Sequence, residues 1–216
     1  RALQPRLPRR HGFLAEQPEL PETCAQHGII FIGPRAEHIR RMGDKLWARR
    51  MAENLGIPVI PGSGLIQEFS GLASVVENMG YPILLKAAAG GGGKGMKIVR
   101  RPEDLQTLFH EASAEALSAF GDGRIYVEAY LPNARHVEIQ MLGDRQGNIV
   151  HLFERDCSLQ RRYQKMLEEA PCPVLSADRR KEICDAALAL ARQVQYESAG
   201  TIEFILDQDK GRFYFL

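Results

Sequence analysis

The most informative segment of this sequence is Pro82-Ile-Leu-Leu-Lys-Ala-Ala-Ala-Gly-Gly-Gly-Gly-Lys-Gly-Met-Lys-Ile-Val99. Two apolar runs of β-strand character flank a loop of five glycines and Lys94, and Lys86 lies at the end of the first run. Glycines let backbone N–H groups close around an anion, and lysines supply charge for phosphate oxygens. The stretch predicts a β-hairpin flap over the phosphates of a nucleotide; a glycine-rich turn without a ligand is the alternative.

The residues around the glycines distinguish this hairpin from other phosphate loops. The spacing G-x-G-x-x-G occurs within residues 90–95, but a dinucleotide fingerprint continues into a helix, whereas residues 96–99 alternate like a strand. A Walker A motif needs Ser or Thr after Gly93-Lys94, where this chain has another glycine. A protein-kinase glycine loop takes its lysine from a later strand, not from a position ahead of the first glycine.

Composition limits the function classes. The chain has 216 residues, 44% of them hydrophobic and 25% charged, which is typical of a globular protein with a sizeable core. A net charge of +1 does not support nucleic-acid binding, and no apolar run is long enough to cross a membrane. Four cysteines without C-x-x-C spacing indicate reduced thiols rather than a zinc site. We therefore expect a cytoplasmic protein, or a mitochondrial matrix protein in a eukaryote.

Hydrophobic periodicity predicts an α+β (α/β) fold whose second half is largely antiparallel. Ile29–Ile32 is expected to form a short, buried parallel strand. The predicted helices are residues 37–42, 44–55, 70–79, 103–120 and 176–194. The predicted strands are the two arms of the glycine hairpin and residues 125–128, 136–142, 148–154, 201–207 and 212–216.

Two strands carry polar residues at positions where chemistry is possible. Glu203 lies in the otherwise apolar strand 201–206, so its carboxylate is exposed, ion-paired or bound to a metal. The strand alone favours exposure, whereas a phosphate-binding flap elsewhere in the chain favours Mg²⁺, which is held by one or two carboxylates and nucleotide phosphates. His136 and Glu138 share one strand face, where a lone histidine is more often structural than a ligand.

Residues 155–165 combine three arginines with Lys165. One interpretation is a solvated basic loop that Glu168 and Glu169 balance. The other is an anion-binding surface, because arginine contacts carboxylates or phosphates in a bidentate manner and lysine acts as a point charge. Composition alone does not separate these two readings.

The order of several motifs resembles that of the biotin carboxylases, the ATP-grasp subunits or domains of acyl-CoA carboxylases and their relatives. The match extends from about His11 to Leu216. Its most specific parts are Arg-His-Val-Glu-Ile-Gln and Glu-Arg-Asp-Cys-Ser. The matching motifs are residues 11–16, 31–34, 43–45, 81–96, 135–140, 154–162, 168–171 and 200–204.

The resemblance implies ATP-dependent carboxylation of biotin by bicarbonate through carboxyphosphate, with Mg²⁺ or Mn²⁺ as the metal. It implies that Lys165 is catalytic, holding bicarbonate or the transferring phosphate, and that Glu203 is a metal ligand. The ATP-binding residues that it implies are Lys45, Lys86, Gly90, Gly91, Gly92, Gly93, Lys94, Gly95, Glu128, Leu131, His136, Gln160, Tyr163 and Ile205. The implied partners are a biotinylated carrier domain, a carboxyltransferase subunit and further copies in an oligomer.

The resemblance also implies an organisation. Residues 1–10 are expected to be an unstructured edge, 11–42 a remnant of the N-terminal biotin carboxylase domain and 43–216 an ATP-grasp domain that is incomplete at its C-terminus. A glycine-rich lid lobe is expected at about residues 58–130. Tyr163 replaces a frequent histidine, and Lys94 replaces an arginine of some members. The segment with the second metal carboxylate and the general base is expected beyond Leu216.

Three functions therefore remain open. The chain is a fragment of a biotin carboxylase, a non-catalytic ATP-binding fragment, or a ligase of the carbamoyl-phosphate-synthetase branch. The motifs at residues 135–140 and 154–162 favour the biotin branch.

Overall fold

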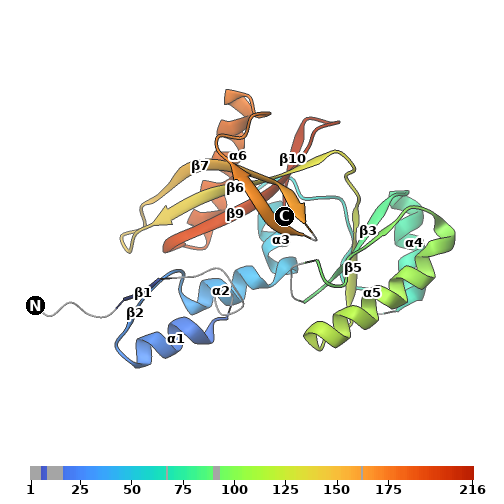
Figure 1. The fold of residues 1–216 in the computed structure, drawn as a ribbon, viewed down its shortest axis with the longest axis horizontal. Coiled ribbons are helices and arrows are strands. Elements are labelled where there is room, and N and C mark those ends of the chain that lie inside the picture. Colours follow the sequence, from blue (N-terminus) through green and yellow to red (C-terminus); the bar gives the residue numbers. More distant parts are fainter. Residues whose placement is uncertain (1–5, 9–16, 67, 90–92, 162) are drawn as a thin grey trace, which may run out of the picture.

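Two antiparallel sheets, each covered by helices, dominate the computed structural model, which describes residues 6–8, 17–66, 68–89, 93–161 and 163–216 (Figure 1). The larger sheet has the strand order β10-β9-β6-β7-β8, and the smaller has the order β4-β3-β5. Helices and separate antiparallel sheets together confirm the predicted α+β class.

The larger sheet has one apolar and one polar face. Its strands are β6 (Ala134–Gly143), β7 (Ile149–Arg161), β8 (Gln164–Glu169), β9 (Ser198–Asp207) and β10 (Arg212–Phe215). Alternate residues of β6 and β9, among them Ile139 and Phe204, are buried against α6 (Ala177–Gln193) and α3 (Lys45–Asn54). Both helices begin at caps that the sequence supplies: Ser176 accepts from the backbone N–H of Arg179, and Asp44 from that of Trp47.

The smaller sheet carries the glycine hairpin and has a core of its own. It consists of β3 (Ile83–Ala87), β4 (Lys97–Val99) and β5 (Ile125–Ala129). The helices α4 (Phe69–Met79) and α5 (Leu105–Phe120) pack beside it, and a 3₁₀ turn (Pro102–Asp104) leads into α5 (Figure 1). Buried Leu105, Phe109, Ala112 and Ala116 form one apolar stripe along α5, which lies within the helix predicted at residues 103–120. The pairing of β3 with β4 confirms the hairpin.

The N-terminal part differs from expectation at two points. Arg6–Pro8 forms strand β1 parallel to β2 (Ile30–Ile32), although residues 1–10 were expected to be unstructured. The parallel geometry of β2 is confirmed, but its burial is not, because Ile32 is 43% exposed. The expectation failed because an apolar run alone does not say whether the next layer covers it. Two helices, α1 (Glu19–Gln26) and α2 (Ala36–Gly43), complete this part.

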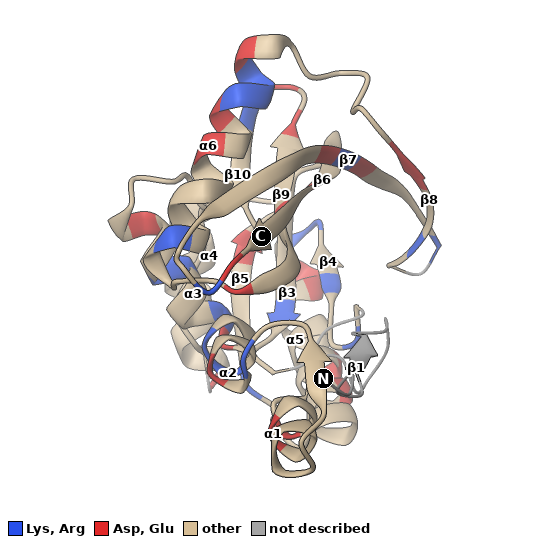
Figure 2. Ribbon diagram, turned by 90° about the vertical axis from the view of Figure 1, so that its left-hand side faces the viewer, with Lys and Arg blue, Asp and Glu red and all other residues tan. Residues whose placement is uncertain are grey.

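The interpretation of residues 155–165 as a solvated basic loop is wrong, because residues 155–161 continue β7 and residues 164–169 form β8. Opposite charges on neighbouring strands explain this: Arg155 lies directly across from Glu138 in the register of β6 and β7. Figure 2 shows both signs of charge along β7 and β8 and interspersed along α6. Among the described residues, no helix combines the length and apolar character that a membrane crossing requires.

Candidate nucleotide and anion site

The polar face of the larger sheet gathers several candidate residues because strand side chains alternate. Val137 and Ile139 of β6 are buried in the core, so His136 and Glu138 lie on the opposite face. The register pairs Glu138 with Glu203 and His136 with Ile205 of β9. Two carboxylates on adjacent strands therefore face the same space.

Glu138 is the centre of this cluster. The residue is 3% exposed and accepts hydrogen bonds from Arg155 Nε, at 2.7 Å, and from Lys165 Nζ. Burial alone would raise the pKa of the Glu138 carboxyl, but the hydrogen bonds from Lys165 and Arg155 outweigh burial and lower it. Glu138 is thus an ionised carboxylate that fixes two cations above the sheet.

Lys165 bridges the two carboxylates. Its Nζ donates to Glu203 Oε1 at 2.7 Å as well as to Glu138. Burial would lower the pKa of Lys165, yet these hydrogen bonds raise it, so the amine stays an ammonium. A permanently charged group with 28% of its side chain exposed can contact an anion that enters from the solvent side.

Glu203 remains ionised and accessible. Its Oε2 lies 3.4 Å from His136 Nε2, and 37% of its side chain is exposed. Burial would raise the pKa of this carboxyl, but His136 and Lys165 lower it to about 2. Solvent at the exposed side of Glu203 screens these electrostatic interactions and weakens them. Mg²⁺ is usually bound by one or two protein carboxylates together with phosphate oxygens, so an ionised, partly exposed carboxylate such as Glu203 is a suitable ligand.

His136 is oriented by its neighbours. Its Nδ1 lies 2.9 Å from Gln160 Nε2, which also donates to the carbonyl of Cys157 at 2.9 Å. The backbone N–H of His136 donates to Ser158 Oγ at 3.0 Å. Because Gln160 holds Nδ1, the Nε2 side of the ring faces Glu203.

The smaller sheet contributes a second charged cluster. Lys86 of β3 donates to Glu128 Oε2 at 2.9 Å, and Arg49 Nη1 of α3 lies 3.4 Å from Glu128 Oε1. Burial would lower the pKa of Lys86, but Glu128 and the ring of Tyr126 beside it raise that pKa. Lys86 is therefore a cation held between strands, next to the glycine loop.

The other predicted residues lie on the elements that carry these clusters or on the segments that connect them. Lys45 is the first residue of α3, one helical turn before Arg49. Leu131 lies in the connection from β5 to β6, and Ile205 follows Glu203 on the same face of β9. The three glycines 90–92 lie outside the described residues, whereas Gly93, Lys94 and Gly95 form the turn that precedes β4.

Tyr163 occupies the turn between β7 and β8, and its ring contacts the glycine segment. A Cβ atom added to Gly93 would lie 2.1 Å from Tyr163 Cδ2. The β7–β8 turn therefore touches the connection between the two arms of the glycine hairpin.

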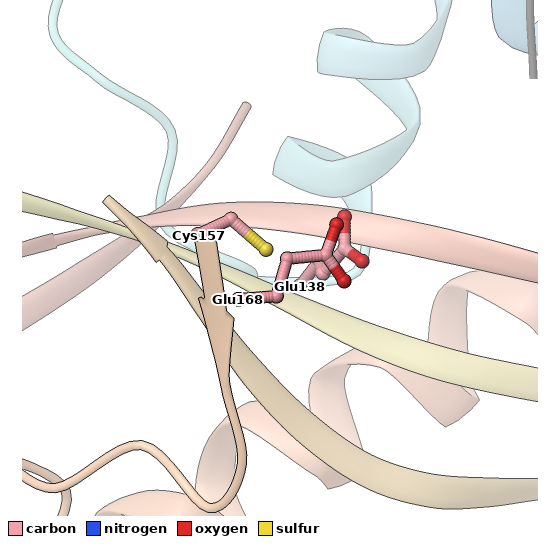
Figure 3. A group of neighbouring side chains, drawn as sticks. All are labelled: Glu138, Cys157 and Glu168. Atoms are coloured by element: carbon pink, nitrogen blue, oxygen red, sulfur yellow. The ribbon is translucent and has the colours of Figure 1, made fainter. Parts of the chain in front are cut away.

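One further group of side chains has the spacing of metal ligands. Glu138, Cys157 and Glu168 come from β6, β7 and β8 and lie close together (Figure 3). Glu138 is already neutralised by Arg155 and Lys165, and Glu168 Oε2 lies 3.2 Å from Arg155 Nε. Burial raises the pKa of the Cys157 thiol to about 12, so it is not a thiolate ligand. The cations make this group a poor metal site.

Sequence reasoning missed three members of the site. Arg155 was read only as part of a basic segment, Glu138 only as a neighbour of His136, and Arg49 not at all. Alternation along β6 identifies the face of Glu138, so that signal was available. The partner of Arg49 depends on how α3 packs against β5, which no local pattern encodes.

Comparison with known proteins places this arrangement in a family. Residues 44–216 match the family model described as carbamoyl-phosphate synthase L chain, ATP binding domain, and residues 10–39 match that of the biotin carboxylase N-terminal domain. The mitochondrial methylcrotonoyl-CoA carboxylase subunit alpha of Dictyostelium discoideum is 51% identical over 205 residues, covering 94% of this chain and 29% of that protein.

Two solved structures are similar over almost the whole chain. The biotin carboxylase of Campylobacter jejuni, in a β-γ-ATP complex, has a TM-score of 0.91 and 44% identity over 97% of this chain and 47% of that one. The biotin carboxylase domain dimer of Hydrogenobacter thermophilus 2-oxoglutarate carboxylase, solved with MgADP and bicarbonate, has a TM-score of 0.90 and 42% identity over 97% and 46%. The chain thus spans less than half of each of these relatives. It belongs to the biotin carboxylase family and has the ATP-grasp fold behind a short N-terminal biotin carboxylase segment.

Proposed function

We propose that this chain is the ATP- and bicarbonate-binding part of a biotin carboxylase. The observation that carries the proposal is the position of Lys165 between Glu138 and Glu203, which puts an ammonium next to a partly exposed carboxylate on the polar face of the sheet. An ammonium suits bicarbonate or a transferring phosphate, and the carboxylate suits a phosphate-bound Mg²⁺.

The remaining predicted residues are assigned to the nucleotide. Lys45, Lys86 and the glycine segment would contact phosphates, while Glu128 and the backbone of Leu131 would face the adenine. His136 and Gln160 would lie near the ribose and phosphates, with Ile205 against the base. Support comes from the Lys86–Glu128 pair at 2.9 Å and from His136 directed at Glu203.

The proposed reaction has two steps. First, a bicarbonate oxygen bonds to the γ-phosphorus of ATP while the bond to the β–γ bridging oxygen breaks, and ADP leaves with that electron pair. Then N1 of biotin loses its proton to a general base. N1 bonds to the carboxyl carbon of carboxyphosphate, and phosphate leaves with the electrons of the broken carbon–oxygen bond.

The contribution of the chain to this reaction is electrostatic. Lys165 and Lys86 would neutralise charge that develops on the phosphoryl oxygens, from positions that carboxylates hold in advance. Glu203 would hold Mg²⁺, which supplies further charge stabilisation when it is bound. Arg155 would act through Glu138, keeping the carboxylate ionised so that Lys165 stays in place.

The activity of the whole enzyme and its partners belong to the same proposal. We expect a biotinylated carrier domain, a carboxyltransferase part and an oligomer to complete the parent enzyme. The acceptor acyl-CoA is set by a transferase part, so the residues of this chain do not define it.

Calorimetry with MgADP and with bicarbonate tests the proposal on the 216-residue chain, with Glu203→Gln as the variant for MgADP binding and Lys165→Gln as the variant for bicarbonate binding. Each should weaken binding about tenfold or more, because a hydrogen bond to a charged group is worth roughly 1.5–3 kcal/mol. Lys181→Gln is the matched control, since Lys181 is an exposed lysine on α6 paired with Asp185 at 2.5 Å. No MgADP uptake by the folded chain would refute the proposal.

An ATPase assay then separates the three readings that the sequence leaves open. Hydrolysis that needs bicarbonate and rises with biotin indicates a competent biotin carboxylase fragment. Nucleotide binding without turnover indicates a non-catalytic fragment. Hydrolysis that needs ammonia and ignores biotin would favour the carbamoyl-phosphate-synthetase branch.

A further inference from the structure

The turn between β7 and β8 has an unusual residue at its tip. Arg161 pairs with Gln164, so only two residues form the turn, and the second of them is Tyr163 with a φ of 63°. Positive φ is unfavourable for a bulky residue, and turns of this length favour glycine or asparagine there. Such strain persists where surrounding contacts hold it, and it is concentrated at functional sites.

The contact that accompanies this strain is with Gly93. A Cβ atom at position 93 would lie 2.1 Å from Cδ2 and 2.6 Å from Cγ of the Tyr163 ring, so the backbone of Gly93 rests against the ring. Gly93 also has a φ of 77°. Position 93 therefore requires glycine for two reasons, its backbone angle and the ring beside it.

The position of this contact connects it to the site. Tyr163 lies in the turn that leads into β8, two residues before Lys165. Gly93 lies in the connection that follows β3, the strand that carries Lys86. The contact thus joins the turn before β8 of the larger sheet to the turn before β4 of the smaller sheet.

We propose that Tyr163 is a positioning residue that holds the Gly93–Gly95 segment beside Lys165, so that backbone N–H groups and the ammonium meet the same phosphates. This inference rests on the proposed nucleotide site. Tyr163 is 51% exposed. Because its ring is half-exposed, its loss should affect local order and ligand affinity more than global stability.

Hydrogen exchange of the ligand-free chain tests the contact independently of nucleotide. In Tyr163→Ala, amides of residues 93–96 should exchange roughly tenfold faster, as expected for loss of one local packing contact. Tyr163→Phe keeps the ring, so the amides of residues 93–96 should exchange at the same rate as in the parent chain. Unchanged exchange in Tyr163→Ala would overturn the proposal.

A double-mutant cycle in MgADP affinity tests the consequence for binding. Gly93→Ala should weaken binding roughly tenfold in the parent chain but much less in the Tyr163→Ala background, where the ring is gone. Gly121→Ala is the matched control, because Gly121 has a φ of 73° and nothing within 4 Å of an added Cβ. Additive effects of Gly93→Ala and Tyr163→Ala would refute the positioning role. If the amides of residues 93–96 exchange faster in Tyr163→Ala but the parent chain binds no MgADP, the contact is supported and the proposed function is refuted.

Discussion

Glu128→Gln is a sharp test of the charged cluster on the smaller sheet. Glu128 is 7% exposed, accepts from Lys86 at 2.9 Å and lies 3.4 Å from Arg49. Only 12% of the Lys86 side chain is exposed, so the substitution leaves a buried ammonium without a counter-charge. We expect the chain to remain folded but to lose much of its stability.

The magnitude follows from the geometry. Two unit charges 2.9 Å apart attract by about 6 kcal/mol at an effective dielectric constant of about 20. Desolvation offsets part of this, and removing one partner of a buried pair typically costs roughly 3–5 kcal/mol. Glutamine still accepts a hydrogen bond from Lys86, so we expect the lower end, a loss of about 3 kcal/mol in the free energy of unfolding.

Urea denaturation followed by circular dichroism at pH 7 measures this loss. Asp185→Asn is the control, because the Lys181–Asp185 pair is shorter, at 2.5 Å, but is exposed to solvent. The free energy of unfolding of Asp185→Asn should equal that of the parent chain within error. The double variant Lys86→Met with Glu128→Leu should regain most of the lost stability, since apolar residues replace the pair. A Glu128→Gln chain within about 1 kcal/mol of the parent would show that water reaches the cluster and that the reasoning is wrong.

Two further predictions follow from the shifted pKa values. The Glu203 pKa is lowered from 4.5 to about 2, so the stability that its ion pairs contribute is present above pH 4.5 and is lost as the pH falls toward 2. Urea midpoints of the parent chain and Glu203→Gln should therefore converge below pH 4.5, and a constant difference would contradict the pairing. Burial raises the pKa of Cys157 to about 12 and those of Cys172 and Cys184 to about 11, so iodoacetamide at pH 8 should modify these thiols only in denaturant. Rapid modification of the native chain, measured by mass spectrometry, would show that they are accessible.

Local periodicity predicted most of the elements because each of them buries one face. The α5 stripe and the alternation of β6 and β9 record directly which side chains face a core. The glycine hairpin was predictable for a similar reason, since two β-type runs flank residues that only a turn accommodates. The helices begin after Asp44 and Ser176 because the side-chain oxygens of these residues accept hydrogen bonds from backbone N–H groups of the first turn.

What could not be predicted depends on the register between distant strands. β7 and β8 carry so many charges that their composition suggests a loop, yet Arg155 is neutralised by Glu138 seventeen positions earlier. Lys165 and Glu203, thirty-eight positions apart, meet for the same reason. Pairing across the sheet places charged residues, which are unfavourable in an isolated strand, next to opposite charges on neighbouring strands. These residues together form the polar face of the larger sheet. The residue pattern alone singled out Glu203 as a possible metal ligand and placed Lys165 in a possible anion-binding segment, and only the family resemblance gave Lys165 a catalytic role.

The two cores show which contacts are decisive for the site. One core joins β6, β9, α3 and α6, while the other joins β3, β5, α4 and α5, so each sheet is stabilised separately. Burial within either core therefore does not determine the distance between Lys86 and Lys165. That distance depends on contacts that cross between the sheets, such as Arg49 with Glu128 and Tyr163 with Gly93. Because the ring of Tyr163 is half-exposed, we expect that weakening its contact with Gly93 changes ligand affinity while both cores stay intact.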